Sequence, residues 1–284
     1  MAPAETPKPP NGPSAPGKHV HLARPIIIVA APRSGSTLLF ELLARSPSVW
    51  TIGGESHQLI ESIPRFDPAR RNFDSNRLTA EDAGPRAVAA LRAGLTAKLR
   101  NRDNQPPPAG TAAVRLLEKT PKNALRVPLL NAVFPDALFI YLFREPHENI
   151  SSILEAWKSR KFITYPRLPG WQGNPWSLVL IPGWRDLIGK DLGEVAAEQW
   201  AVTNRILLDD LEQLPSERWT TVSYNQLVAE PQATAVRLCE FAGIEWDQDL
   251  KKGQLPHARH TLTPPHWARS ARCRAANRPG PGRR

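Results

Sequence analysis

The sequence predicts an α/β fold in which a central parallel sheet of about five strands has helices on both faces. Two observations support this fold class. Short apolar runs alternate along the chain with segments of helical periodicity. Several of these runs are apolar at consecutive positions, as parallel strands are when both of their faces are buried.

The elements follow in order from the periodicity and the helix breakers. We expect strands at residues 25–31, 48–52, 114–119, 138–144 and 219–224. We expect helices at residues 36–45, 85–100, 123–134, 194–214 and 231–242, and a further helix that begins at Pro146, a favoured residue for a first helical position. Residues 105–110 form a Pro-rich loop, and residues 161–193 predict a long loop of the kind that serves a binding site or a lid.

Composition divides the chain into three regions. Residues 1–23 predict a disordered Pro-rich lead, residues 24–250 the folded domain, and residues 251–284 a basic, irregular tail. The tail carries nine lysines and arginines and no acid, so it accounts for most of the net charge of +10 and leaves the domain near neutral. The basic balance therefore does not indicate nucleic-acid binding.

Cysteine usage and hydropathy indicate the compartment. Two cysteines, Cys239 and Cys273, are too few for a disulfide framework and suit a reducing environment. No apolar run approaches the length of a membrane span, and the N-terminal residues lack the apolar core of a signal peptide. We expect a cytoplasmic protein without a membrane span.

Charged residues follow the predicted strands at their carboxyl ends. Arg33, Glu55, Lys119 and Arg144 all lie at or just beyond such an end. Ligands of parallel sheets bind along this edge. The sequence therefore predicts one active site that contains these four residues.

The loop after the first strand has the composition of an anion site. Backbone N–H groups are unpaired at a helix N-terminus, Gly35 permits a sharp turn, and Arg33 adds a permanent charge. Ala30 and Ser36 stand where a triphosphate-binding P-loop carries its first glycine and its lysine. We therefore expect a smaller phosphate, bound without a metal ion, on a loop of six residues: Arg33, Ser34, Gly35, Ser36, Thr37 and Leu38.

With "PRSGST" and "YLFREPHENISS", the chain resembles the sulfotransferases that use 3′-phosphoadenosine 5′-phosphosulfate (PAPS). The resemblance implies a P-loop-NTPase-like three-layer fold and a donor whose 5′-phosphosulfate lies on the first motif. It also implies that Arg144 and Ser152, eight residues apart, bind the 3′-phosphate, and that Tyr224 of "TTVSYNQLVAEP" lies near the adenine. The product would be 3′,5′-ADP (PAP).

The general base is inferred from the same resemblance. Cytosolic sulfotransferases carry Lys-Thr-His where this chain has Lys119-Thr120-Pro121, and proline takes no proton. Tyrosylprotein sulfotransferases place a glutamate about twenty residues beyond the loop arginine, which here matches Glu55. We expect Glu55 to be the base, with His57 as the nearest substitute, and Arg33 and Lys119 to stabilise the leaving group.

Other interpretations stay open from sequence alone. The chain could be a P-loop kinase that uses ATP and Mg²⁺, or a non-catalytic nucleotide- or RNA-binding protein. Glu55 could cap the following helix, Lys119 could be a plain exposed lysine, and Tyr224 could be a core aromatic. The acceptor is a hydroxyl compound of open identity (carbohydrate, small metabolite or peptide), whose pocket we expect from residues 56–84 and 161–193, and the oligomeric state is equally open.

Overall fold

The computed structural model describes residues 20–246 and centres on a four-stranded parallel sheet of order β4-β2-β5-β8. Its strands are β2 (Ile26–Val29), β4 (Leu117–Lys119), β5 (Leu138–Phe143) and β8 (Trp219–Ser223). β2 is buried at every residue, as a strand covered on both faces must be. The α/β class and the parallel central sheet are confirmed.

The predicted second strand is wrong. Residues 48–52 contribute only isolated bridges, from Trp50 to Leu116 and from Thr51 to Arg100. The predicted strand at residues 114–119 is split into β3 (Ala113–Val114) and β4, and β3 pairs with β1 (His21–Leu22) beyond the main sheet. The central sheet therefore has four strands, and the parallel bridge from Trp50 to Leu116 adds a further short pairing.

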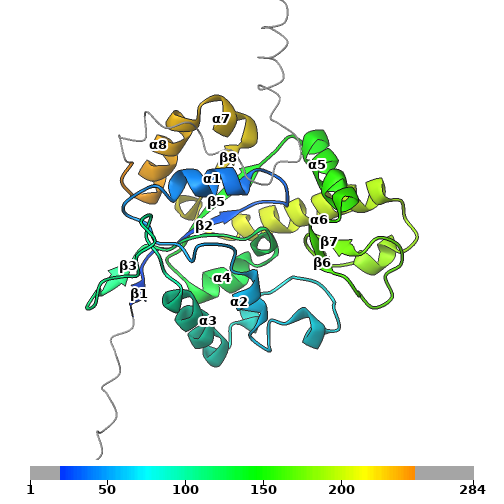
Figure 1. The fold of residues 1–284 in the computed structure, drawn as a ribbon, viewed down its shortest axis with the longest axis horizontal. Coiled ribbons are helices and arrows are strands. Elements are labelled where there is room, and N and C mark those ends of the chain that lie inside the picture. Colours follow the sequence, from blue (N-terminus) through cyan, green and yellow to red (C-terminus); the bar gives the residue numbers. More distant parts are fainter. Residues whose placement is uncertain (1–19, 247–284) are drawn as a thin grey trace, which may run out of the picture.

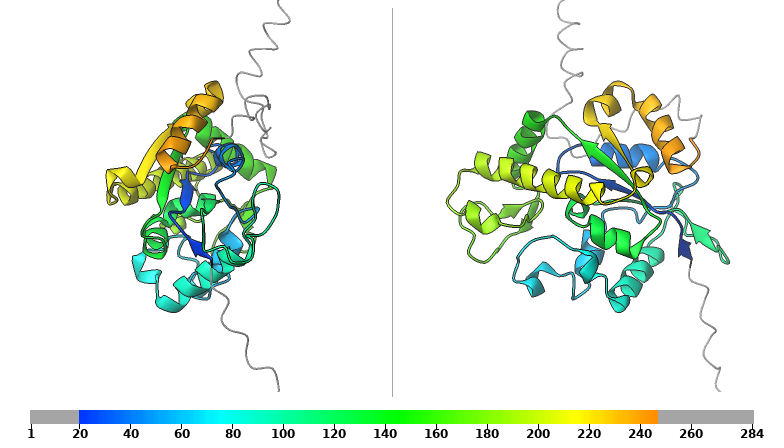
Figure 2. Two further views of the ribbon diagram at one scale, coloured as in Figure 1. Left: turned by 90° about the vertical axis from the view of Figure 1, so that its left-hand side faces the viewer. Right: turned by 180° about the vertical axis from the view of Figure 1, so that it is seen from behind.

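Helices cover both faces of the sheet, as Figure 1 shows and as the view from behind in Figure 2 repeats. On one face lie α1 (Ser36–Leu43), α7 (Tyr224–Ala229) and α8 (Pro231–Ala242), whose apolar side chains pack with Ile26 and Ile28. On the other lie α3 (Pro85–Ala97), α4 (Val127–Val133) and part of α6 (Leu192–Glu212), which pack with Ile27 and Val29. Alternate residues of β2 thus serve opposite layers.

A third apolar cluster lies beside the sheet, where α5 (Pro146–Ser159) packs on the first half of α6. It contains four tryptophans in mutual ring contact: Trp157, Trp171, Trp176 and Trp184. The predicted long loop at residues 161–193 therefore has structure of its own. It includes the antiparallel pair β6 (Ile163–Tyr165) and β7 (Trp176–Ser177) and the 3₁₀ turn η4 (Trp184–Leu187).

Several predicted helix boundaries shift for local reasons. The expected helix at residues 123–134 is a 3₁₀ segment, η3 (Pro121–Leu125), followed by α4, because Pro128 has no N–H to continue a helix through this point. α6 begins earlier than expected, because Asp191 forms a capping box with Glu194. β8 ends at Ser223, which caps α7, so Tyr224 opens a helix.

Four short elements complete the described chain: α2 (His57–Glu61), η1 (Pro68–Arg71), η2 (Ala80–Asp82) and η5 (Ser216–Arg218). Residues 1–19 of the predicted lead and the whole predicted tail lie outside the described residues. Within residues 20–246, none of the helices has the length and apolar character needed to cross a bilayer.

Candidate active site

The four parallel strands present their carboxyl ends along one edge of the sheet. Arg33 follows β2, Lys119 is the last residue of β4, Arg144 follows β5, and Tyr224 follows β8. The predicted placement at strand ends is confirmed for Arg33, Lys119 and Arg144, whereas Glu55 follows a segment that makes only isolated bridges. The sheet thus gathers three cations from distant parts of the sequence.

The loop between β2 and α1 has the backbone shape of an anion cradle. Arg33 and Gly35 adopt positive φ angles of 68° and 100°, and α1 begins directly afterwards at Ser36. Asn149 of α5 anchors this loop, since its amide donates to the carbonyl of Pro32 (2.9 Å) and its Oδ1 accepts from the hydroxyl of Ser34 (2.8 Å). The free N–H groups of a helix start here beside an arginine, which favours a bound anion.

Tyr224 lies against the glycine of the loop. A Cβ on Gly35 would stand 2.5 Å from Tyr224 Cδ2, so no larger residue fits beneath the ring as it stands. The guanidinium of Arg144 lies 4.6 Å from the centre of the same ring. The tyrosine is half-buried at the site edge, where it also packs against the apolar cluster of α1 and α8.

Arg144 reaches both the loop and its own helix. Its Nη1 lies 3.5 Å from the carbonyl oxygen of Arg33, and its Nε donates to Glu148 Oε2 at 3.1 Å. Ser152 lies four residues beyond Glu148 on α5 and so projects from the same helix face. Arg144, through its bond to Glu148, and Ser152, the two residues predicted to bind the 3′-phosphate, therefore lie along the same face of α5.

Arg33 lies under an aromatic ring from the long connection. Its guanidinium is 4.6 Å from the ring centre of Phe162. Burial, together with the positive charge of Arg144, lowers the pKa of Arg33. Two guanidinium groups held this close repel each other, and a bound anion relieves that repulsion.

Glu55 forms a second group of charges with Lys119 and His57. Lys119 Nζ donates to Glu55 Oε1 at 2.6 Å and to the hydroxyl of Thr37 at 3.3 Å, while His57 Nδ1 lies 3.4 Å from Glu55 Oε2. Burial raises the pKa of Glu55, but the hydrogen bond from His57 and the charge of Lys119 outweigh it and lower that pKa to about 2. Glu55 is thus an ion-paired carboxylate and does not cap α2, and Lys119 is buried instead of freely exposed.

Glu118 is buried beside this group. Its Oε1 accepts from the hydroxyls of Ser56 and Thr120, each at 2.6 Å, and its Oε2 accepts from Asn123 Nδ2 at 2.8 Å. Burial raises the pKa of Glu118, against the lowering effect of these hydrogen bonds. Its carboxyl is thus bound by two hydroxyls and an amide instead of a basic side chain.

Another polar cluster ties the long connection to α2. Glu61 accepts from Lys122 at 2.8 and 2.9 Å and from Arg126 at 2.6 Å. Lys122 Nζ also lies 3.2 Å from the hydroxyl of Tyr165 on β6, which accepts from Asn76 at 2.6 Å. Phe162, which contacts Arg33, directly precedes β6, so these bonds also restrain the segment that carries it.

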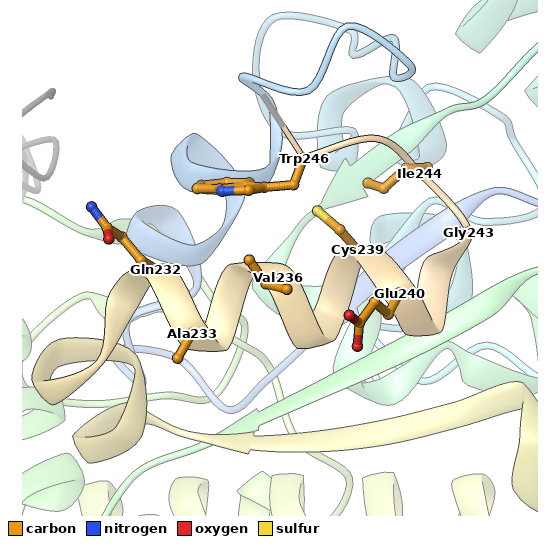
Figure 3. A pocket seen from close by; sticks show the side chains of 8 residues that line it. All are labelled: Gln232, Ala233, Val236, Cys239, Glu240, Gly243, Ile244 and Trp246. Carbon is orange, nitrogen blue, oxygen red and sulfur yellow. The ribbon is translucent and has the colours of Figure 1, made fainter. Parts of the chain in front are cut away.

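A pocket of about 440 Å³ lies elsewhere, along α8 (Figure 3). Its walls include Val236 and Cys239 of the helix and Ile244 and Trp246 of the segment that follows, and none of the predicted site residues lines it. Burial raises the pKa of the Cys239 thiol to about 11, so this thiol stays protonated at neutral pH. The part of the chain that the structure describes contains no group of three metal-binding side chains.

Comparison with known proteins identifies the family. The model of the sulfotransferase family matches residues 25–248. The chain belongs to the sulfotransferase family. It is 26% identical over 227 residues to protein-tyrosine sulfotransferase A of Caenorhabditis elegans, which covers 79% of this chain and 51% of that protein, so the chain spans about half the length of this curated relative.

Two solved structures are similar in fold. One is the sulfotransferase domain from the curacin biosynthetic pathway, with a TM-score of 0.49 and 22% identity over 81% of this chain and 77% of that one. The other is sulfotransferase STF1 from Mycobacterium tuberculosis H37Rv, with a TM-score of 0.48 and 16% identity over 82% of this chain and 70% of that one.

Sequence reasoning missed three residues that shape the site. Asn149 lies 115 residues from the Ser34 that it binds, and Phe162 stands in a segment without periodicity. Glu118 is a buried acid whose partners Ser56 and Asn123 lie outside its own strand. One signal was available, since a buried strand that ends in an acid next to a lysine calls for polar partners on both side chains.

Proposed function

We propose that the chain is a sulfotransferase that moves a sulfuryl group from PAPS to a hydroxyl of its acceptor. The observation that carries this proposal is the pair Arg33 and Arg144, two guanidinium groups brought together beside the N-terminus of α1. Such an arrangement fits a ligand with phosphate groups at two separate positions. The family of the chain supports the same donor.

The residues present fit this donor. The loop amides and Arg33 would hold the 5′-phosphosulfate, and Arg144 with Ser152 the 3′-phosphate. Because Gly35 has no side chain, the ring of Tyr224 packs directly on the loop backbone. In this proposal, the anion binds on the face of the loop away from that ring. The hydroxyls of Ser36 and Thr37 add donors at the helix start.

Sulfuryl transfer needs one displacement at sulfur. The acceptor oxygen forms a bond to sulfur while the bond from sulfur to the phosphate oxygen of the nucleotide breaks, and the electron pair leaves on that oxygen. Lys119 and Arg33 stabilise the charge that develops there without reorganising. The proton of the acceptor hydroxyl passes to Glu55, so charge and atoms balance.

Lys119 connects the two halves of this reaction. It is ion-paired to Glu55 at 2.6 Å while it also contacts Thr37 of the donor loop. An anionic donor on that loop competes for the ammonium group. As the ion pair between Lys119 and Glu55 weakens, the proton affinity of Glu55 rises, so Glu55 becomes a better base once the donor is bound.

The test is calorimetric titration of the protein with 3′,5′-ADP and, separately, with ADP and Mg²⁺. We expect metal-independent binding of 3′,5′-ADP that is lost in Arg144→Ala. Binding of Mg-ADP alone would overturn the proposal and favour the kinase, which Ser36 already disfavours by standing at the position of the phosphate-binding lysine.

The proposal specifies the acceptor only by its chemical class, a hydroxyl group on a protein or small molecule. The tyrosine substrate named for the nematode relative supports a peptide as one candidate, and a carbohydrate is another. In this proposal, the polar cluster of Glu61, Lys122 and Tyr165 lies on the acceptor side of Glu55. The cytoplasmic location and the extent of the domain stay predictions.

A further inference from the structure

Glu118 is a buried acid that the proposed chemistry does not use. It is 5% exposed, yet its two oxygens accept three hydrogen bonds, from Ser56, Thr120 and Asn123. A buried polar group needs such partners, but they could have come from anywhere in the chain. Two of them come from the segments that carry the proposed catalytic side chains.

The hydroxyl partners place Glu118 between two backbones. Ser56 is flanked by Glu55 and His57, and Thr120 directly follows Lys119. The Thr120 hydroxyl donates to Glu118 and accepts the backbone N–H of Ser56 at 2.8 Å, and the two hydroxyls lie 3.1 Å apart. One carboxyl thus closes a small network of hydrogen bonds that joins the start of α2 to the end of β4.

We propose that Glu118 is a positioning residue, whose buried carboxyl fixes the segment that carries Glu55 against the strand end that carries Lys119. The catalytic meaning of this inference rests on the proposed function, since it concerns the base and the cation of that reaction. The bond it protects is the 2.6 Å contact between Glu55 Oε1 and Lys119 Nζ. Among the described residues, no sheet pairing joins these two segments at that point, since the nearest strand bridge lies at Trp50.

The proposal makes the pKa of Glu55 a reporter of position. The charged or titratable groups that face Glu55 are His57 of α2, Lys119 of β4 and Lys122 of η3. If the two segments separate, the hydrogen bond from His57 stays but the lysine contact lengthens, so the pKa of Glu55 rises from about 2 because the lowering effect of Lys119 is lost. A role in folding alone would lower the melting temperature and leave this pKa unchanged.

The experiment is a ¹³C NMR titration of Glu55 in protein labelled at glutamate carboxyls, with the resonance assigned by its loss in Glu55→Gln. Two variants remove the link: Glu118→Met takes away the acceptors, and Thr120→Val takes away one hydroxyl. Two matched controls keep it: Glu118→Gln retains a carbonyl oxygen for the hydroxyls, and Thr120→Ser retains the hydroxyl. We expect the first pair to raise the pKa of Glu55 by about one unit or more and the second pair to leave it within about 0.3 units.

An unchanged pKa of Glu55 in both folded link-breaking variants would overturn the proposal. Should Glu118→Met fail to fold, Ser56→Ala decides the question, because it removes one hydroxyl donor to Glu118 and keeps the Ser56 N–H on Thr120. Titration with 3′,5′-ADP separates this inference from the proposed function. Wild-type protein that fails to bind 3′,5′-ADP refutes the proposed function, whereas the NMR shift tests the positioning of Glu55 with or without that ligand.

Discussion

Glu55 is the general base in the proposed reaction. Replacing it by glutamine keeps the shape and removes the proton acceptor, so Glu55→Gln should lower turnover by about 10²–10⁴-fold, the usual contribution of a positioned general base. Affinity for 3′,5′-ADP should be retained, because Glu55 contacts the proposed donor loop only through Lys119, and Glu55→Gln leaves that ammonium group available to the nucleotide. Steady-state kinetics with an acceptor found by screening, beside calorimetry, checks both, and full activity in the variant would show that the proton goes elsewhere.

The same residue makes folding stability depend on pH in a defined direction. Its pKa is about 2 in the folded protein against 4.5 ordinarily, so the unfolded chain takes up this proton first as the pH falls. The stabilisation by Glu55 is therefore complete above about pH 4.5 and is lost progressively as the pH falls toward 2. Glu55→Gln has no such group to titrate.

Urea unfolding of wild type and Glu55→Gln at a series of pH values measures this effect. The difference in free energy of unfolding between the two proteins should shrink as the pH is lowered below about 4.5, since all other carboxyls cancel. A difference that is constant between pH 7 and pH 3 would mean that the ion pair with Lys119 does not persist in solution.

At the scale of elements, α5 supports the donor loop through one side chain. Asn149 is fully buried and binds Pro32 and Ser34, so Asn149→Ala leaves a buried carbonyl and a buried hydroxyl without this partner. We expect a loss of about 1–3 kcal/mol in stability. We also expect about tenfold weaker binding of 3′,5′-ADP, which corresponds to about 1.4 kcal/mol.

A matched control exists on α6. Asn204 is also buried and binds the hydroxyl of Tyr141 at 2.9 Å, away from the loop. Asn204→Ala should cost comparable stability and leave 3′,5′-ADP affinity unchanged in calorimetry. Equal losses of affinity in the two variants would indicate a general effect of destabilisation in place of a specific loop anchor.

Elements also show where prediction from sequence succeeds. The runs of β2 and β5 are long, apolar and bounded by turn residues, so their strands follow from hydrophobic periodicity alone. The segment at residues 48–52 has the same apolar character but pairs only at Trp50 and Thr51. Whether such a segment joins a sheet depends on neighbours far along the chain, which local periodicity does not contain.

The candidate site was predictable in outline because of the geometry of a parallel sheet. Any residue directly after a strand arrives at the same edge, so the common location of Arg33, Lys119 and Arg144 required only the strand ends. The contacts among them were not predictable. Glu118 and Ser56 are 62 residues apart in the sequence, and Phe162, which stacks on Arg33, lies in a segment without periodicity. Both contacts therefore depend on tertiary packing.

At the scale of the whole molecule, the arginines of the proposed donor site and those of residues 268–284 lie in different parts of the sequence. Residues 268–284 carry six arginines and no acid, whereas the proposed donor contacts all lie between Arg33 and Tyr224. Deleting residues 268–284 should therefore leave the affinity for 3′,5′-ADP unchanged. Any binding of the full chain to polyuridylate, used as an RNA probe, should weaken steeply with added salt and be lost in the deletion, since unspecific contacts between arginine and phosphate release counterions.

Fluorescence anisotropy with labelled polyuridylate at several salt concentrations, beside calorimetry with 3′,5′-ADP, measures both effects on the same pair of proteins. RNA binding that survives the deletion and resists salt would place an RNA site on the domain itself and favour the RNA-binding alternative. Loss of 3′,5′-ADP affinity in the deletion would instead make the last residues part of the donor site. The expected pattern, retention of the nucleotide and loss of the RNA, would assign nucleotide binding to the edge of the sheet, where Arg33 and Arg144 lie.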